Sequence, residues 1–171
     1  FGSNGAVEDV TGLACSEGIR SQIGCMKLAL RSAQDGISLV QTAEGALQEV
    51  HSILQRVRDL TAQGANDSNN AKSRDAIQKE INTLGDELTR IAGSTNFNGI
   101  KLLSGGDTLT FQVGAGSVAA EDQISVALTD FATLGADIKT LAATMTDAAT
   151  YGTALAGIDT QIQAVSTARA G

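Results

Sequence analysis

The sequence predicts a mostly α-helical protein, an elongated bundle of three long helices with a small β-hairpin element. Two of these helices are N-terminal and one is C-terminal. Three observations support this class: apolar residues recur every three or four positions over long stretches, segments with a period of two are brief, and the 171 residues include no proline. A chain of this length can bury one apolar core, so we expect one domain over residues 1–171.

The first long helix is expected over residues 1–65, and its periodic pattern is clear from about residue 8. Its apolar residues follow the a and d positions of a heptad, which is typical of helices that pack lengthwise. They are Ile19, Ile23, Met26, Leu30, Ala33, Ile37, Val40, Leu47, Val50, Leu54 and Val57.

A turn is expected over residues 63–70, where Gly, Asn, Asp and Ser cluster, with Asn69 or Asn70 as the N-cap of the next helix. The second helix is expected over 71–93, and its apolar positions are Ile77, Ile81, Leu84, Leu88 and Ile91. Two i,i+4 ion pairs are expected on its outer face, Asp75–Lys79 and Asp86–Arg90.

The β element is expected within residues 94–128. Asn98-Gly99 is a strong hairpin-turn dipeptide, and residues 108–113 and 123–128 alternate as short strands do, with a loop between them. Residues 129–140 are expected to form a loop with at most one helical turn around Leu134. The third long helix is expected over 141–171, with apolar positions Leu141, Met145, Ala148, Leu155, Ile158, Ile162, Val165 and Ala168.

Several function classes are excluded by composition and motifs. The net charge is −7 and aromatic residues make up 3%, so the chain lacks the basic and stacking surfaces of nucleic-acid binders. No apolar run reaches the ~18 residues of a membrane span. One histidine and two cysteines make neither a metal site nor a catalytic pair, and no nucleotide or hydrolase motif occurs. We expect no enzyme activity, cofactor, metal, nucleic acid or membrane partner.

The two cysteines, Cys15 and Cys25, would be roughly 15 Å apart on one helix, which is too far for a disulfide between them. One interpretation makes them small, partly buried side chains. The other makes them thiols available for cross-linking between chains or for engineered coupling.

Residues 31–64, RSAQDGISLVQTAEGALQEVHSILQRVRDLTAQG, closely resemble the N-terminal core of bacterial flagellin, as do residues 75–105, DAIQKEINTLGDELTRIAGSTNFNGIKLLSG. The closing IDTQIQAVSTARAG also fits this family. The resemblance implies the rod (D1) domain of a filament subunit, without the terminal polymerisation helices and the outer variable domains. Cysteine at positions 15 and 25 departs from the family pattern.

The resemblance further implies a secreted, extracellular structural protein of the flagellum that serves motility and binds other flagellin subunits. An export chaperone would bind only segments that this chain lacks, and a monomer is expected in solution. Toll-like receptor 5 is an implied partner. The positions that match its contact surface in receptor-activating flagellins are Gln55, Arg56, Leu60, Gln63 and Glu80. On the alternative interpretation, Arg56 and Glu80 are ordinary solvated charges and Leu60 continues the apolar pattern.

Two further alternatives remain at this stage. A hook–filament junction protein resembles flagellin at its ends, although the close match over 31–105 argues against it. The chain could also be an engineered, flagellin-derived carrier or adjuvant module with introduced cysteines.

Overall fold

A computed structural model of the protein describes residues 18–106, 108–114, 116 and 119–170. The chain forms two compact units, whereas the sequence predicts one domain. The first unit comprises Phe1–Gln41 and Asp107–Leu128, and the second comprises Thr42–Gly106 and Thr129–Gly171. Helix α3 (Gly18–Gly64) is continuous and contributes residues to both units.

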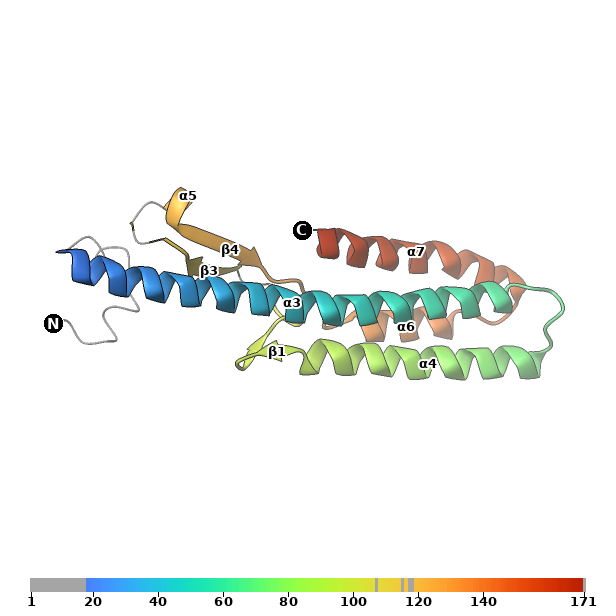
Figure 1. Cartoon of the computed structure of the whole chain (residues 1–171). Coiled ribbons are helices and arrows are strands. Elements are labelled where there is room, and N and C mark those ends of the chain that lie inside the picture. The colour runs from blue at the N-terminus through green and yellow to red at the C-terminus, as the bar shows by residue number, and fades with distance from the viewer. Residues whose placement is uncertain (1–17, 107, 115, 117–118, 171) are drawn as a thin grey trace. The chain divides into compact units, whose positions relative to one another are not determined.

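The second unit is a helical bundle. The C-terminal part of α3 packs with α4 (Ala71–Ser94), α6 (Leu134–Ala143) and α7 (Ala148–Ala170), as Figure 1 shows. One contiguous core joins these helices, and Leu47, Val50, Leu54 and Val57 supply the share of α3. The predicted helical class is confirmed, and the heptad pattern predicts the buried face of this part of α3.

A hydrogen-bonded cap fixes the start of α4 and confirms the expected N-cap. The side chain of Asn70 accepts a hydrogen bond from the Ser73 N–H at 2.8 Å, and the Ser73 hydroxyl accepts one from the Asn70 N–H at 3.0 Å. This reciprocal pair satisfies two amide groups that no helix carbonyl can reach. The neighbouring Asn69 amide donates to the Gln63 and Asn66 carbonyls and so closes the turn.

The C-terminal region differs from the expectation. Helix α6 covers residues 134–143, whereas a loop with at most one helical turn around Leu134 was predicted over 129–140. The last helix begins at Ala148 rather than at 141. The break is stabilised by Asp147, whose carboxylate accepts a hydrogen bond from the Thr150 N–H at 2.9 Å. This hydrogen bond is the largest cause of a lowered pKa for the Asp147 carboxyl. A second hydrogen bond, from the Thr150 hydroxyl, lowers the same pKa further. A new helix therefore starts here although the apolar period continues across the break.

One of the two predicted ion pairs on α4 forms. Lys79 lies 3.1 Å from Asp75, as expected. Asp86 instead binds Lys139 of α6 at 2.8 Å, and Arg90 pairs with Glu87, so the predicted Asp86–Arg90 pair is wrong. The physical reason is α6 itself, because this unanticipated helix offers Asp86 a cation on a neighbouring element.

The short hairpin after α4 agrees with the sequence. Strands β1 (Asn96–Phe97) and β2 (Ile100–Lys101) pair antiparallel, with Phe97 opposite Ile100. Asn98 and Gly99 have φ values of 52° and 83°, the left-handed backbone that this tight turn requires.

In the first unit, β3 (Thr108–Gln112) pairs antiparallel with β4 (Gln123–Ala127), as the alternation predicts, and α5 (Ala119–Asp122) lies in the connection. The hairpin packs on α3, where the Phe111 ring lies against Gly36. Contrary to the prediction of lengthwise packing, most of the apolar pattern on this part of α3 is exposed. We call the exposed set the N-terminal stripe: Ile19, Ile23, Met26, Leu30, Ile37 and Val40.

Cys25 is buried, with 6% of its surface exposed, and is disulfide-bonded. The expectation of an unbonded Cys25 thiol assumed that both cysteines lie on one helix. Helix α3 is described from Gly18 onward. Cys15 lies outside the described residues.

Candidate functional site

The candidate site is an exposed surface formed by Gln55, Arg56 and Gln63 of α3 and Glu80 of α4, which we call the α3/α4 surface. Gln63 follows Arg56 by seven residues, two helical turns, so both side chains leave the same side of α3. The structure therefore brings together four of the five predicted contact positions as exposed polar groups.

Arg56 and Glu80 form the centre of this surface. The Arg56 guanidinium donates to the same Glu80 carboxylate oxygen through Nη2 at 2.9 Å and through Nε at 3.2 Å. The two side chains are 53% and 46% exposed, so the pair adds at most about 1 kcal/mol to stability and salt screens it. The pair links two long side chains, one from α3 and one from α4.

Gln55 lies at the end of the surface nearest His51. Its Nε2 is 3.4 Å from His51 Nε2, a contact whose donor depends on the histidine tautomer. His51 Nδ1 is buried and has no hydrogen-bond partner among the residues that the structure describes. Gln55 is thus the more exposed member of this pair, and its amide can also bind a partner molecule.

Leu60 is not part of the exposed surface. Only 2% of its area is accessible, and it belongs to the core of the second unit. It lies three residues after Val57 and continues the heptad pattern, as the alternative interpretation holds. A direct receptor contact by Leu60, which the resemblance implies, is inconsistent with this burial.

Asp59 is a further exposed residue of this face, beyond the five positions that the resemblance implies. It lies four residues after Gln55 and four before Gln63, so helical geometry places it between them on α3. This four-residue spacing could have identified Asp59 from the sequence. Its carboxylate gives the surface a second acceptor beside the Arg56–Glu80 pair.

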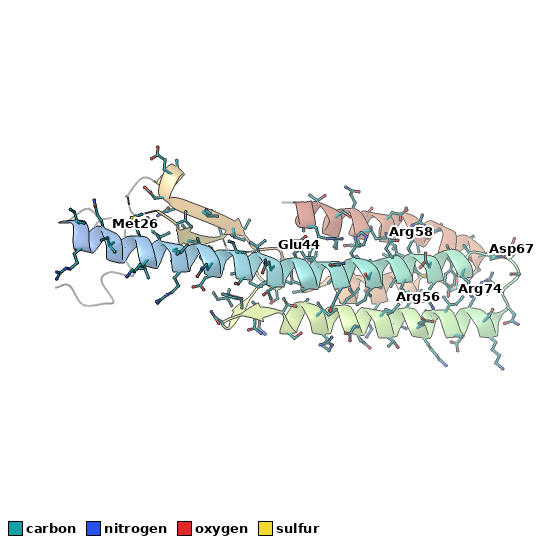
Figure 2. The ribbon with its side chains drawn as sticks, in the orientation of Figure 1. Met26, Glu44, Arg56, Arg58, Asp67 and Arg74 are labelled. Carbon is teal, nitrogen blue, oxygen red and sulfur yellow. The ribbon has the colours of Figure 1, made fainter. Side chains whose placement is uncertain are left out.

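A second ion pair lies on the opposite flank of α3. Arg58 Nε donates to Asp159 Oδ1 of α7 at 2.6 Å, and both side chains are about half exposed. This hydrogen bond raises the pKa of the Arg58 guanidinium. In Figure 2, Arg56 lies on the α4 side of α3 and Arg58 on the α7 side, so the two arginines provide a matched comparison.

The described residues contain no group of three or more His, Cys, Asp or Glu side chains that could hold a metal ion. Over the same ranges, no helix combines the length and apolarity needed to cross a membrane. The arrangement of the α3/α4 surface suits binding of a protein partner through charge-assisted hydrogen bonds.

The fold thus defines a helical-bundle protein that presents a polar, ion-paired face on two adjacent helices. A family model described as the bacterial flagellin N-terminal helical region matches residues 3–108. Because this match covers more than half of the sequence, the chain belongs to the bacterial flagellin family.

Individual relatives agree with this assignment. The chain is 43% identical over 167 residues to a flagellin of Halalkalibacterium halodurans, covering 97% of this chain and 60% of that protein. It is 50% identical over 115 residues to polar flagellin F of Vibrio parahaemolyticus, covering 67% of this chain and 30% of that protein. The crystal structure of Bacillus cereus flagellin matches with a TM-score of 0.65 and 36% identity, over 80% of this chain and 77% of the other. The chain thus spans 60% of the length of the Halalkalibacterium halodurans protein and 30% of the length of the Vibrio parahaemolyticus protein.

Proposed function

We propose that the protein is part of a structural subunit of the bacterial flagellar filament, which acts outside the cell by assembly and carries out no catalysis. The observation that carries this proposal is the family match over residues 3–108 together with the structural similarity to a flagellin over 80% of the chain. The partners are other flagellin subunits. Polar outer faces such as the α3/α4 surface are available for contacts between subunits, while the apolar core holds each bundle together.

A chimeric flagellin tests this proposal. The flagellin of Bacillus subtilis is 48% identical to this chain over 147 residues, so its matching segment can be replaced by the present sequence in a strain without its own flagellin. We expect cells with the chimera to swim, because the fold of the replaced segment is kept. A matched chimera with Ile81→Asp, which places a charge in the core, should lose motility. Export of an intact chimera without motility would contradict the proposal.

We further propose that Toll-like receptor 5 binds the α3/α4 surface. The supporting observation is the exposed Arg56–Glu80 pair, since the ion pair orders the arginine before binding and leaves its outer edge free for a partner carboxylate or carbonyl. An ordered, exposed arginine flanked by glutamines has the composition of an interface anchor with a polar rim.

Binding of the purified chain to the receptor ectodomain tests this second proposal. Arg56→Ala is expected to weaken binding by about tenfold or more, because an anchor residue contributes over 1 kcal/mol. Arg58→Ala removes another partly exposed, ion-paired arginine from the opposite flank and should change affinity by less than about twofold. Equal affinities of the two variants would refute the assignment of this surface.

A further inference from the structure

The turn between β1 and β2 consists of Asn98 and Gly99, and both residues are exposed. Both have left-handed φ values, 52° and 83°, and a Cβ on Gly99 would meet no atom of the described residues within 4 Å. Within the same described ranges, the side-chain amide of Asn98 has no hydrogen-bond partner. An unbonded asparagine amide is therefore followed by a backbone nitrogen that no side chain shields.

We propose that Asn98 is a site of spontaneous deamidation. The Gly99 nitrogen forms a bond to the Asn98 side-chain carbon Cγ, and the bond between Cγ and Nδ2 breaks. The amide nitrogen leaves as ammonia, carrying the proton that the Gly99 nitrogen loses, and a succinimide ring remains. Water then adds to either ring carbonyl and opens the ring to aspartate or isoaspartate. Water is the one co-reactant of this sequence, and the inference is independent of the proposed function.

The folded turn has to open before this reaction can occur. In the closed turn the Gly99 N–H donates to Asn96 Oδ1, so this nitrogen is engaged away from the Asn98 side chain. The restraint is weak, because the hydrogen bond is long at 3.3 Å and each of the two strands has only two residues. A hairpin this short opens locally at low free-energy cost, while the helical bundle stays folded.

Formation of isoaspartate would alter the end of α4. Isoaspartate adds one methylene group to the main chain, so the two-residue turn no longer matches the pairing of Phe97 with Ile100. The hairpin also carries Lys101, whose Nζ donates to the Gly93 carbonyl in the last turn of α4. Deamidation is therefore expected to loosen the hairpin at this helix end.

Asn96 lies in the same hairpin and provides an internal control. The next residue is Phe97, whose side chain crowds the nitrogen that would have to attack. The Asn96 amide is also engaged, because its Nδ2 donates to the Ser94 carbonyl at 3.0 Å. Both features disfavour ring formation at Asn96, although it is exposed as Asn98 is.

Peptide mapping of the folded full chain after incubation at mildly alkaline pH tests the proposal. Trypsin releases residues 91–101, which contain both asparagines, and digestion in heavy-oxygen water labels any conversion that occurs during the digest. We expect Asn98 to convert at least about tenfold faster than Asn96, into a mixture of aspartate and isoaspartate. Equal rates at the two positions, no conversion at Asn98, or aspartate alone, which direct hydrolysis would give, would overturn the proposal.

Two variants test whether opening of the hairpin controls the rate. Ile100→Ala weakens the cross-strand pair with Phe97 and should speed the conversion of Asn98 by about threefold. Ile81→Ala weakens the core of the second unit without touching the hairpin, so it should change the rate by less than about twofold. An effect of Ile81→Ala equal to or larger than that of Ile100→Ala would show that Asn98 reacts from the unfolded chain, and would overturn the inference.

Discussion

Gly135→Ala is expected to lower the free energy of unfolding by about 3 kcal/mol, one of the two largest effects that we anticipate. Gly135 lies where α6 crosses α4 with almost no space between the backbones. A Cβ at this position would be 2.2 Å from the Gly85 carbonyl oxygen and 2.9 Å from the Thr89 amide nitrogen. Backbone atoms cannot rotate away as a flexible side chain can, so α6 must move off α4. That movement would separate core residues that the two helices share, including Leu88 and Ile138.

Chemical denaturation followed by far-UV circular dichroism measures this change. Gly152→Ala is the matched control, because a Cβ on that glycine of α7 would meet no atom of the described residues within 4 Å. Alanine has a higher helix propensity than glycine. The free energy of unfolding of the Gly152→Ala control is therefore expected to rise by up to about 1 kcal/mol. A Gly135→Ala protein as stable as the parent would show that α4 and α6 do not approach so closely.

Ile81→Ala is expected to lower the free energy of unfolding by a similar amount, about 3 kcal/mol. The Ile81 side chain is fully buried in the core between the helices of the second unit. Its truncation removes apolar surface from the core and leaves a cavity that the surrounding helices can only partly close. The same denaturation experiment reports the loss.

The control for this change is Ile100→Ala, which makes the same truncation at an exposed residue of β2 in the same unit. Its effect should stay below about 1 kcal/mol. If both substitutions have the same small effect, the core described for the second unit is incorrect.

The sequence predicts those elements whose signals are local. The Asn70 cap is specified by its own side chain and that of Ser73, and the β1–β2 turn by the Asn98-Gly99 dipeptide. The buried face of α3 from Leu47 to Val57 follows from its heptad period, which needs no knowledge of the partner helices. These parts of the fold agree with the structure.

Features that depend on long-range packing could not be predicted in this way. Helix α6 has ten residues, which are too few for a clear helical period in the sequence. A glycine such as Gly135 favours a loop assignment, and only its close contact with Gly85 explains why it lies in a helix. Period likewise shows that Ile19 and Leu30 share one side of α3, but it does not show whether anything covers them. The Asp147–Thr150 cap was a usable signal for the break before α7, because an aspartate that precedes a helix is a common N-cap.

The candidate site shows the same division. Helical spacing correctly groups Gln55, Arg56 and Gln63 on one side of α3, and it could also have added Asp59. The pairing of Arg56 with Glu80, 24 residues away, depends on how α4 packs beside α3. Leu60 lies three residues after Val57, so the heptad pattern alone predicts its burial, whereas the resemblance implies a surface contact; the structure agrees with the pattern.

Electron microscopy of cells that carry the chimeric flagellin tests the central claim most directly, because it observes assembly itself rather than its effect on swimming. The account predicts filaments of normal length on cells with the parent chimera and none on cells with the Ile81→Asp chimera. Exported, folded chimera in the culture medium together with cells that lack filaments would contradict the claim that this chain is part of a filament subunit.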